Sequence, residues 1–107
     1  SFAINAAITA MTGIEPVILG KPSLAALHCA RSLMGLPTDA THKLIVVGDD
    51  PGLEMRMARA ASAASIGVTT GLSDATDFGA HADEQADFVV RSLDELCVRL
   101  GERIDAV

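Results

Sequence analysis

The stretch Leu44-Ile45-Val46-Val47-Gly48-Asp49-Asp50 consists of four apolar residues followed by a glycine and two acids. Because all four leading residues are apolar, the stretch predicts a strand that is buried on both faces, as in the centre of a parallel sheet. The functional groups of open parallel sheets collect outside the carboxyl ends of the strands. The sequence therefore places Asp49 and Asp50 at a candidate functional edge.

Short apolar runs alternate with helical patterns on both sides of this stretch. We expect further strands at 66–70 and 88–90, helices at 2–11, 24–34, 53–64 and 93–104, and a polar, acidic loop at 73–87. A capping box, Ser92-Leu93-Asp94-Glu95, opens the last helix. Strands and helices in this order form right-handed parallel crossovers. The pattern predicts one α/β domain over 1–107, a Rossmann-like parallel sheet of about three strands with flanking helices in three layers.

Composition and charge restrict the kind of partner. Half of the 107 residues are hydrophobic, but only three are aromatic, which suits helices packed on a sheet better than a surface that stacks on bases. Fourteen Asp and Glu against eight Lys and Arg give a net charge of −6, the wrong sign for nucleic acid or an anionic membrane. We therefore expect neither of these partners. A small ligand that is cationic, or that binds with the help of a metal ion, suits the acidic charge better.

The two cysteines, Cys29 and Cys97, fall inside helical patterns and show no paired spacing. This arrangement favours buried thiols in a reducing compartment over a disulfide or a metal site. We therefore expect a cytoplasmic protein.

Three carboxylates, those of Asp49, Asp50 and Glu54, lie within six positions after the first predicted strand. Clustered carboxylates repel one another unless a cation lies among them, and hard oxygen ligands of this kind suit Mg²⁺. The same spacing also fits an Asp that caps a helix with an acid in its first turn. Spacing alone leaves both interpretations open.

A second candidate is the turn Gly20-Lys21-Pro22-Ser23. It is not a phosphate-binding P-loop, because Glu15 stands where the first glycine would be and Pro22 separates the lysine from the serine. A lysine beside a helix start can still neutralise a phosphate or a carboxylate. The alternative is an ordinary exposed lysine.

Read together, five segments along the chain resemble the carboxy-terminal part of a haloacid dehalogenase superfamily phosphatase of the capped, 4-nitrophenylphosphatase-like subfamily. They are Gly20-Lys21-Pro22, Val47-Gly48-Asp49, Glu54, Ile66-Gly67-Val68-Thr69-Thr70-Gly71 and the run from Ala86 to Leu96. The order of the five segments, rather than any one of them, carries the resemblance.

The resemblance implies a role for each candidate residue. Lys21 would be the catalytic lysine that steadies the charge on the nucleophile and the phosphoryl group. Asp49 would be a Mg²⁺ ligand, Asp50 would contribute through water, and Glu54 would help to hold the metal where Asp is usual. The chain also departs from the family pattern, with Leu53 in place of a hydroxyl residue and with Ala58 and Ser62 in place of glycines.

A further departure is an absence, because no Asp-x-Asp motif, which provides the family's nucleophile, occurs in the 107 residues. We therefore expect the chain to be an incomplete, carboxy-terminal part of the core hydrolase domain. The resemblance implies that the intact protein is a Mg²⁺-dependent hydrolase that cleaves small phosphorylated metabolites through an aspartyl-phosphate. The chain alone is predicted to be inactive.

Two other interpretations compete with the phosphatase. The chain could be a non-catalytic α/β binding or interaction module that retains an acidic metal pocket. A phosphoacceptor receiver-like domain fits poorly, because no later strand ends in an acceptor Asp followed by a strand ending in Lys. As part of a longer phosphatase, the chain would leave unpaired the edge of the strand at 44–47 where the missing first strand pairs, which predicts self-association of the isolated piece, with a homodimer as the simplest product.

Overall fold

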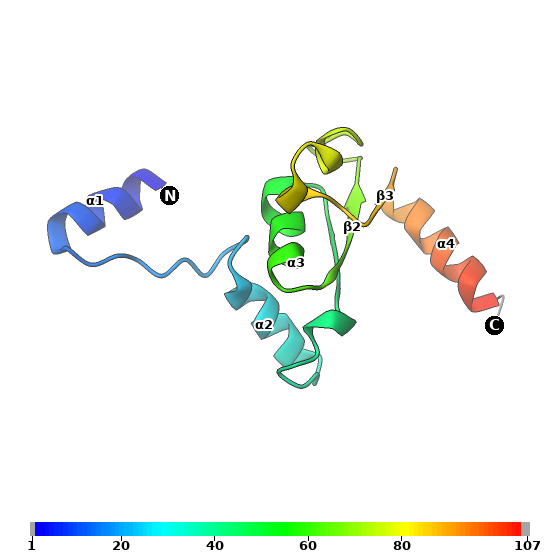
Figure 1. Ribbon diagram of the computed structural model, residues 1–107, viewed down its shortest axis with the longest axis horizontal. Helices are drawn as coiled ribbons and strands as arrows, with labels where there is room; N and C mark the ends of the chain where they lie inside the picture. The colour runs from blue at the N-terminus through cyan, green and yellow to red at the C-terminus, as the bar shows by residue number, and fades with distance from the viewer. Residues whose placement is uncertain (1, 106–107) are drawn as a thin grey trace.

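A computed structural model describes the backbone of residues 2–105 and the side chains as far as Glu102 (Figure 1). The helices are α1 (Phe2–Thr12), α2 (Leu24–Leu33), α3 (Arg56–Ala60) and α4 (Leu93–Asp105), and the strands are β1 (Ile45–Gly48), β2 (Ala64–Val68) and β3 (Phe88–Val90). The short helical turns are η1 (Thr41–Lys43), η2 (Pro51–Met55), η3 (Asp77–Gly79) and η4 (Ala82–Glu84). The strands form one parallel sheet in the order β1-β2-β3, which confirms the predicted α/β class.

Alternation along β1 separates the two faces of the sheet. Leu44 and Val46 are buried, whereas Ile45 and Val47 are exposed. The buried side chains pack with Leu27 of α2 and with the α3 region, forming the core cluster. That cluster consists of Leu27, Leu44, Val46, Met57, Ala58 and Ala63. Helices α2 and α3 therefore form one layer beside the sheet (Figure 1).

The opposite face of the sheet is only partly covered. Helix α4 lies on this side and contacts β3 (Figure 1). Ser92 caps α4 by accepting the backbone N–H of Glu95 at 3.0 Å, as the capping box predicts. Ile45 is 59% exposed and Phe88 is 69% exposed, although both are large apolar side chains on strands. The three layers are present, but the outer layer leaves an apolar surface open.

The expected helix over 53–64 is wrong at both ends. The chain forms the π-helical turn η2 and then the short helix α3, and β2 begins at Ala64 rather than at residue 66. A Schellman motif ends α3, because the N–H of Ala63 bonds to the carbonyl of Ala58 and the N–H of Ser62 to that of Arg59. Ser62 has φ +55°, in the left-handed region where glycine is usual.

Helix α1 and the segment that follows it lie apart from the sheet (Figure 1). No residue of α1 is buried, and Ile14, Val17 and Leu19 are also largely exposed. None of the helices described is both long and apolar enough to span a bilayer. The prediction of buried thiols is wrong, because Cys29 of α2 and Cys97 of α4 are exposed.

Candidate functional site

The Asp49 side chain leaves the end of β1 and lies against the turn that follows β2. A Cβ placed on Gly71 would lie 2.5 Å from Asp49 Cγ, which is closer than real Cβ contacts come. The backbone N–H of Leu72 faces Asp49 Oδ2, with 3.4 Å between nitrogen and oxygen. Parallel pairing of β1 with β2 brings Asp49 beside this turn, as the sequence predicts for the carboxyl ends of adjacent strands.

Glu54 is the buried acid of the group, since only 6% of the residue is accessible to solvent. The η2 turn folds it back over β1, where a Cβ on Gly48 would lie 2.6 Å from Glu54 Cβ. Glu54 Oε2 accepts the backbone N–H of Asp50 at 3.1 Å, and Oε1 forms an ion pair with Lys21. A glycine at position 48 is thus what lets the glutamate approach the strand.

Lys21 reaches this acid from a turn 33 residues earlier in the chain. Ser23 caps α2 by accepting the N–H of Ala25, which fixes the start of the helix directly after the lysine turn. The hydrogen bond and the charge of Glu54 raise the pKa of Lys21, burial opposes them, and the charges of Asp49 and Asp50 raise it further. The two separate sequence signals therefore meet at one place.

Asp50 acts as the N-cap of η2. Its Oδ1 accepts the backbone N–H of Gly52 at 2.9 Å, so the capping interpretation is confirmed for this residue. The second carboxylate oxygen makes no hydrogen bond among the described residues.

A shallow hollow of about 260 Å³ opens beside Asp49. Its lining residues are Val47, Gly48, Asp49, Val68, Thr70, Gly71 and Leu93. The predicted Thr69-Thr70-Gly71 turn thus forms one wall.

The three predicted metal ligands do not converge on one point. Within residues 2–102, no three His, Cys, Asp or Glu side chains gather closely enough to hold a metal. Glu54 is neutralised by Lys21, whereas Asp49, half-buried, has no cationic partner among the described ion pairs. The donor chemistry of Asp49 and Asp50 fits a hard cation such as Mg²⁺, with further ligands needed from elsewhere. The assignment of Asp49, Asp50 and Glu54 to a metal stays a prediction.

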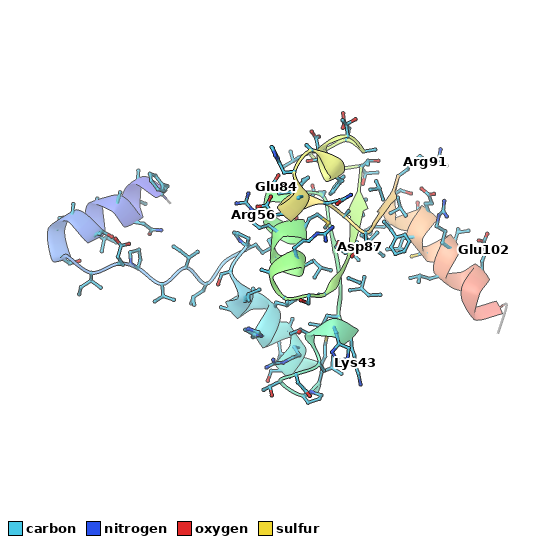
Figure 2. All side chains as sticks on the ribbon, viewed as in Figure 1. Lys43, Arg56, Glu84, Asp87, Arg91 and Glu102 are labelled. Atoms are coloured by element: carbon cyan, nitrogen blue, oxygen red, sulfur yellow. The ribbon has the colours of Figure 1, made fainter. Side chains whose placement is uncertain are left out.

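Residues that the sequence analysis missed hold the acidic loop against this site. Arg56 forms an ion pair with Glu84, which lies beside it in Figure 2. It forms a second ion pair with Asp83 at 3.4 Å. Phe78 anchors the same loop by packing its ring against Gly67 of β2. A Cβ on Gly67 would lie 2.6 Å from that ring, so the contact requires a glycine. No motif marks these contacts, because their partners are distant in the sequence and meet only after folding.

The sequence of this chain matches that of a known protein family over most of its length. A family model described as HAD-hydrolase-like matches residues 18–96, which is most of the chain. The chain belongs to the HAD-hydrolase-like family. The match includes Lys21, Asp49, Asp50 and Glu54, so the whole candidate site lies inside the family region. A search of curated proteins finds no match.

Solved structures support the same family and fold. A p-nitrophenyl phosphatase from Archaeoglobus fulgidus is 28% identical with a TM-score of 0.73, and the match covers 88% of this chain and 36% of that one. A 4-nitrophenylphosphatase from Thermotoga maritima is 32% identical with a TM-score of 0.71, covering 88% and 35%. A magnesium complex of a glycerol phosphate phosphatase from Mycobacterium tuberculosis is 27% identical with a TM-score of 0.69, covering 88% and 27%.

These HAD-hydrolase-like structures agree with the expected 4-nitrophenylphosphatase-like subfamily. The chain spans about a third of the length of the phosphatases that it matches. The fold and the family are therefore shown for this chain.

Proposed function

We propose that this chain supplies the lysine and the metal-binding acids of a Mg²⁺-dependent phosphatase that hydrolyses small phosphate monoesters. The observation that carries the proposal is the Lys21–Glu54 ion pair at the carboxyl end of β1, near enough to Asp49 and Asp50 for their charges to raise the pKa of the lysine. The names of three similar structures, two nitrophenyl phosphatases and one glycerol phosphate phosphatase, support the reaction class.

Lys21 would provide fixed positive charge for a bound phosphate. Its ammonium group is held by Glu54 and remains half exposed, so one side is open to a ligand. A lysine in this setting stabilises charge on phosphoryl oxygens without taking part in bond making. Its raised pKa keeps it protonated throughout the neutral range.

Asp49 and Asp50 would hold the metal, with Glu54 supporting the site through its contact with the Asp50 backbone. Bound Mg²⁺ would neutralise phosphate charge and orient the phosphoryl group. The magnesium complex of the similar glycerol phosphate phosphatase agrees with this choice of ion. Gly71 and Gly48 leave room for the acidic side chains.

The nucleophile is not among these 107 residues, since they contain no Asp-x-Asp. We propose that a longer form of the protein supplies an aspartate whose oxygen attacks phosphorus and displaces the alcohol. Water then cleaves the resulting aspartyl-phosphate and releases inorganic phosphate. The 107-residue chain is expected to have no turnover of its own.

The test is a phosphatase assay on the longer protein, with and without Mg²⁺. Asp49→Ala should remove nearly all turnover of a nitrophenyl phosphate ester, whereas Asp74→Ala, in the exposed acidic loop, should leave it within about twofold. Near-normal activity of the Asp49 variant would overturn the assignment.

The missing nucleophile supports a second candidate, a non-catalytic binding module. The two differ in the reading frame upstream of residue 1. An apolar strand followed by Asp-x-Asp there favours the enzyme, and its absence together with retained Mg²⁺ binding favours the module.

A further inference from the structure

Arg56 and Glu84 connect the acidic loop to the η2 turn. Arg56, the first residue of α3, directly follows η2, and Glu84 lies in η4, 28 positions later. Figure 2 shows the two side chains close together beside α3. Arg56 also reaches Asp83, so one guanidinium serves two acids.

Glu84 also lies against the backbone of η2. A Cβ on Gly52 would be 3.8 Å from Glu84 Oε1 and 3.4 Å from Asp50 Oδ1. Two carboxylates therefore flank the same glycine from different parts of the chain. Carboxylates that share a neighbourhood repel one another, and only 17% of the Glu84 side chain is exposed, which limits screening by water. Arg56 supplies the positive charge that offsets this repulsion.

The η2 turn also sets the position of the candidate site. It carries Asp50 at its start and Glu54 near its end, and the Asp50 N–H donates to Glu54. A displacement of η2 would move both acids and, through Glu54, the Lys21 ion pair.

We propose that Arg56 and Glu84 are a positioning pair, which holds η2 against η4 and so keeps Asp50 and Glu54 in place. The pair touches neither metal nor substrate in this role. Its effect on catalysis rests on the proposed phosphatase function, whereas its effect on η2 does not.

The electrostatics predict an unequal response to substitution. Arg56→Gln removes the cation and leaves the Glu84 and Asp50 carboxylates beside Gly52 without it, whereas Glu84→Gln removes the repulsion together with the ion pair. We therefore expect the Arg56 variant to disturb η2 more than the Glu84 variant. Because the Arg56 side chain is about half exposed, the ion pair adds little to overall stability, and both variants should stay folded.

The experiment measures hydrogen exchange of the Asp50 amide by NMR in the 107-residue chain and in any longer active form. We expect the Asp50 amide to exchange about fivefold to tenfold faster in Arg56→Gln and less than threefold faster in Glu84→Gln. The charge-swapped double variant R56E/E84R should bring the exchange rate part of the way back to that of the wild type. The Ser65 amide, held by Asp87 at 2.8 Å, serves as an internal reference for global opening. Arg59→Gln is the matched control, because Arg59 bonds to Gln85 rather than to Glu84.

Equal acceleration at Asp50 and Ser65, or no acceleration at Asp50, would overturn the positioning role. In an active longer form, kcat should fall about threefold to tenfold in Arg56→Gln with little change in substrate KM. A longer form that lacks phosphatase activity but still shows the exchange pattern would contradict the proposed function and leave the positioning pair supported.

Discussion

The carboxylate of Asp49 occupies the space that a side chain on Gly71 would need, because a Cβ there would lie 2.5 Å from Asp49 Cγ. Gly71 is thus a contact point between the turn after β2 and the end of β1. The sequence offers Gly71 only as a turn residue, and its role depends on strand pairing.

The first prediction follows from this contact. Gly71→Ala should displace the Asp49 carboxylate and lower Mg²⁺ affinity by about tenfold, since one ligand would be misplaced. Isothermal titration with Mg²⁺ measures the change. Gly79→Ala is the control, because nothing lies within 4 Å of a Cβ at that position. Equal Mg²⁺ affinity in the Gly71→Ala and Gly79→Ala variants would contradict the proposed effect of the Gly71–Asp49 contact on the metal.

The second prediction concerns Ser62, which ends α3 with φ +55°. Ser62→Gly should stabilise the chain by about 0.5–1 kcal/mol, because glycine adopts the left-handed region without a Cβ penalty. Urea unfolding measures the free energy of unfolding. Ala61→Gly, at φ −94° beside it, should instead destabilise. A lower free energy of unfolding in the Ser62→Gly variant would contradict the idea that Ser62 is strained in the left-handed region.

The third prediction concerns the Lys21–Glu54 pair. Lys21→Met leaves the buried Glu54 carboxylate without its cation and should cost about 1 kcal/mol in the free energy of unfolding. Lys21→Arg keeps the charge and should lose less. Because the folded-state pKa of Lys21 is raised, the contribution is complete below about pH 10 and is lost as pH rises through the folded-state pKa. A wild-type stability unchanged between pH 9 and pH 12 would contradict the pairing.

The fourth prediction concerns Glu95 at the start of α4. The N–H of Arg91 and the Arg99 guanidinium lower the pKa of Glu95 to about 2. The stabilisation is therefore complete above about pH 4.3 and is lost as pH falls towards 2. A carbon-detected NMR titration should show Arg99→Gln raising the pKa of Glu95. Arg91→Gln should raise it less, because the backbone N–H remains. An ordinary Glu95 pKa in the wild type would contradict the contacts.

The fifth prediction concerns the open sheet face at Ile45 and Phe88. The exposed apolar side chains of Ile45 on β1 and Phe88 on β3, together with the unpaired edge of β1, should make the 107-residue chain self-associate, with a homodimer as the first product. Phe88→Lys should shift sedimentation towards monomer. Leu33→Lys, an exposed apolar position on α2, is the control and should leave association unchanged. A monomeric wild type at high concentration would contradict the prediction.

Much of the fold could be predicted from local patterns. The apolar run ending at Val47 gave β1, the glycines at 13 and 35 gave the ends of α1 and α2, and the capping box gave α4. The region from Pro51 to Ala64 could not be predicted in the same way. There a buried Glu54 and a left-handed Ser62 depend on tertiary contacts rather than on helical periodicity.

The sequence by itself determined the α/β class, the candidate residues and the absence of the Asp-x-Asp nucleophile, because periodicity, residue type and motif order are local properties. Only the tertiary structure decided which of those residues meet. It paired Lys21 with Glu54 across 33 positions, made Asp50 a cap, set Asp49 against Gly71, and placed Arg56 beside Glu84. The physical reason is parallel strand pairing, which brings distant loops to one edge of the sheet where charges interact through space.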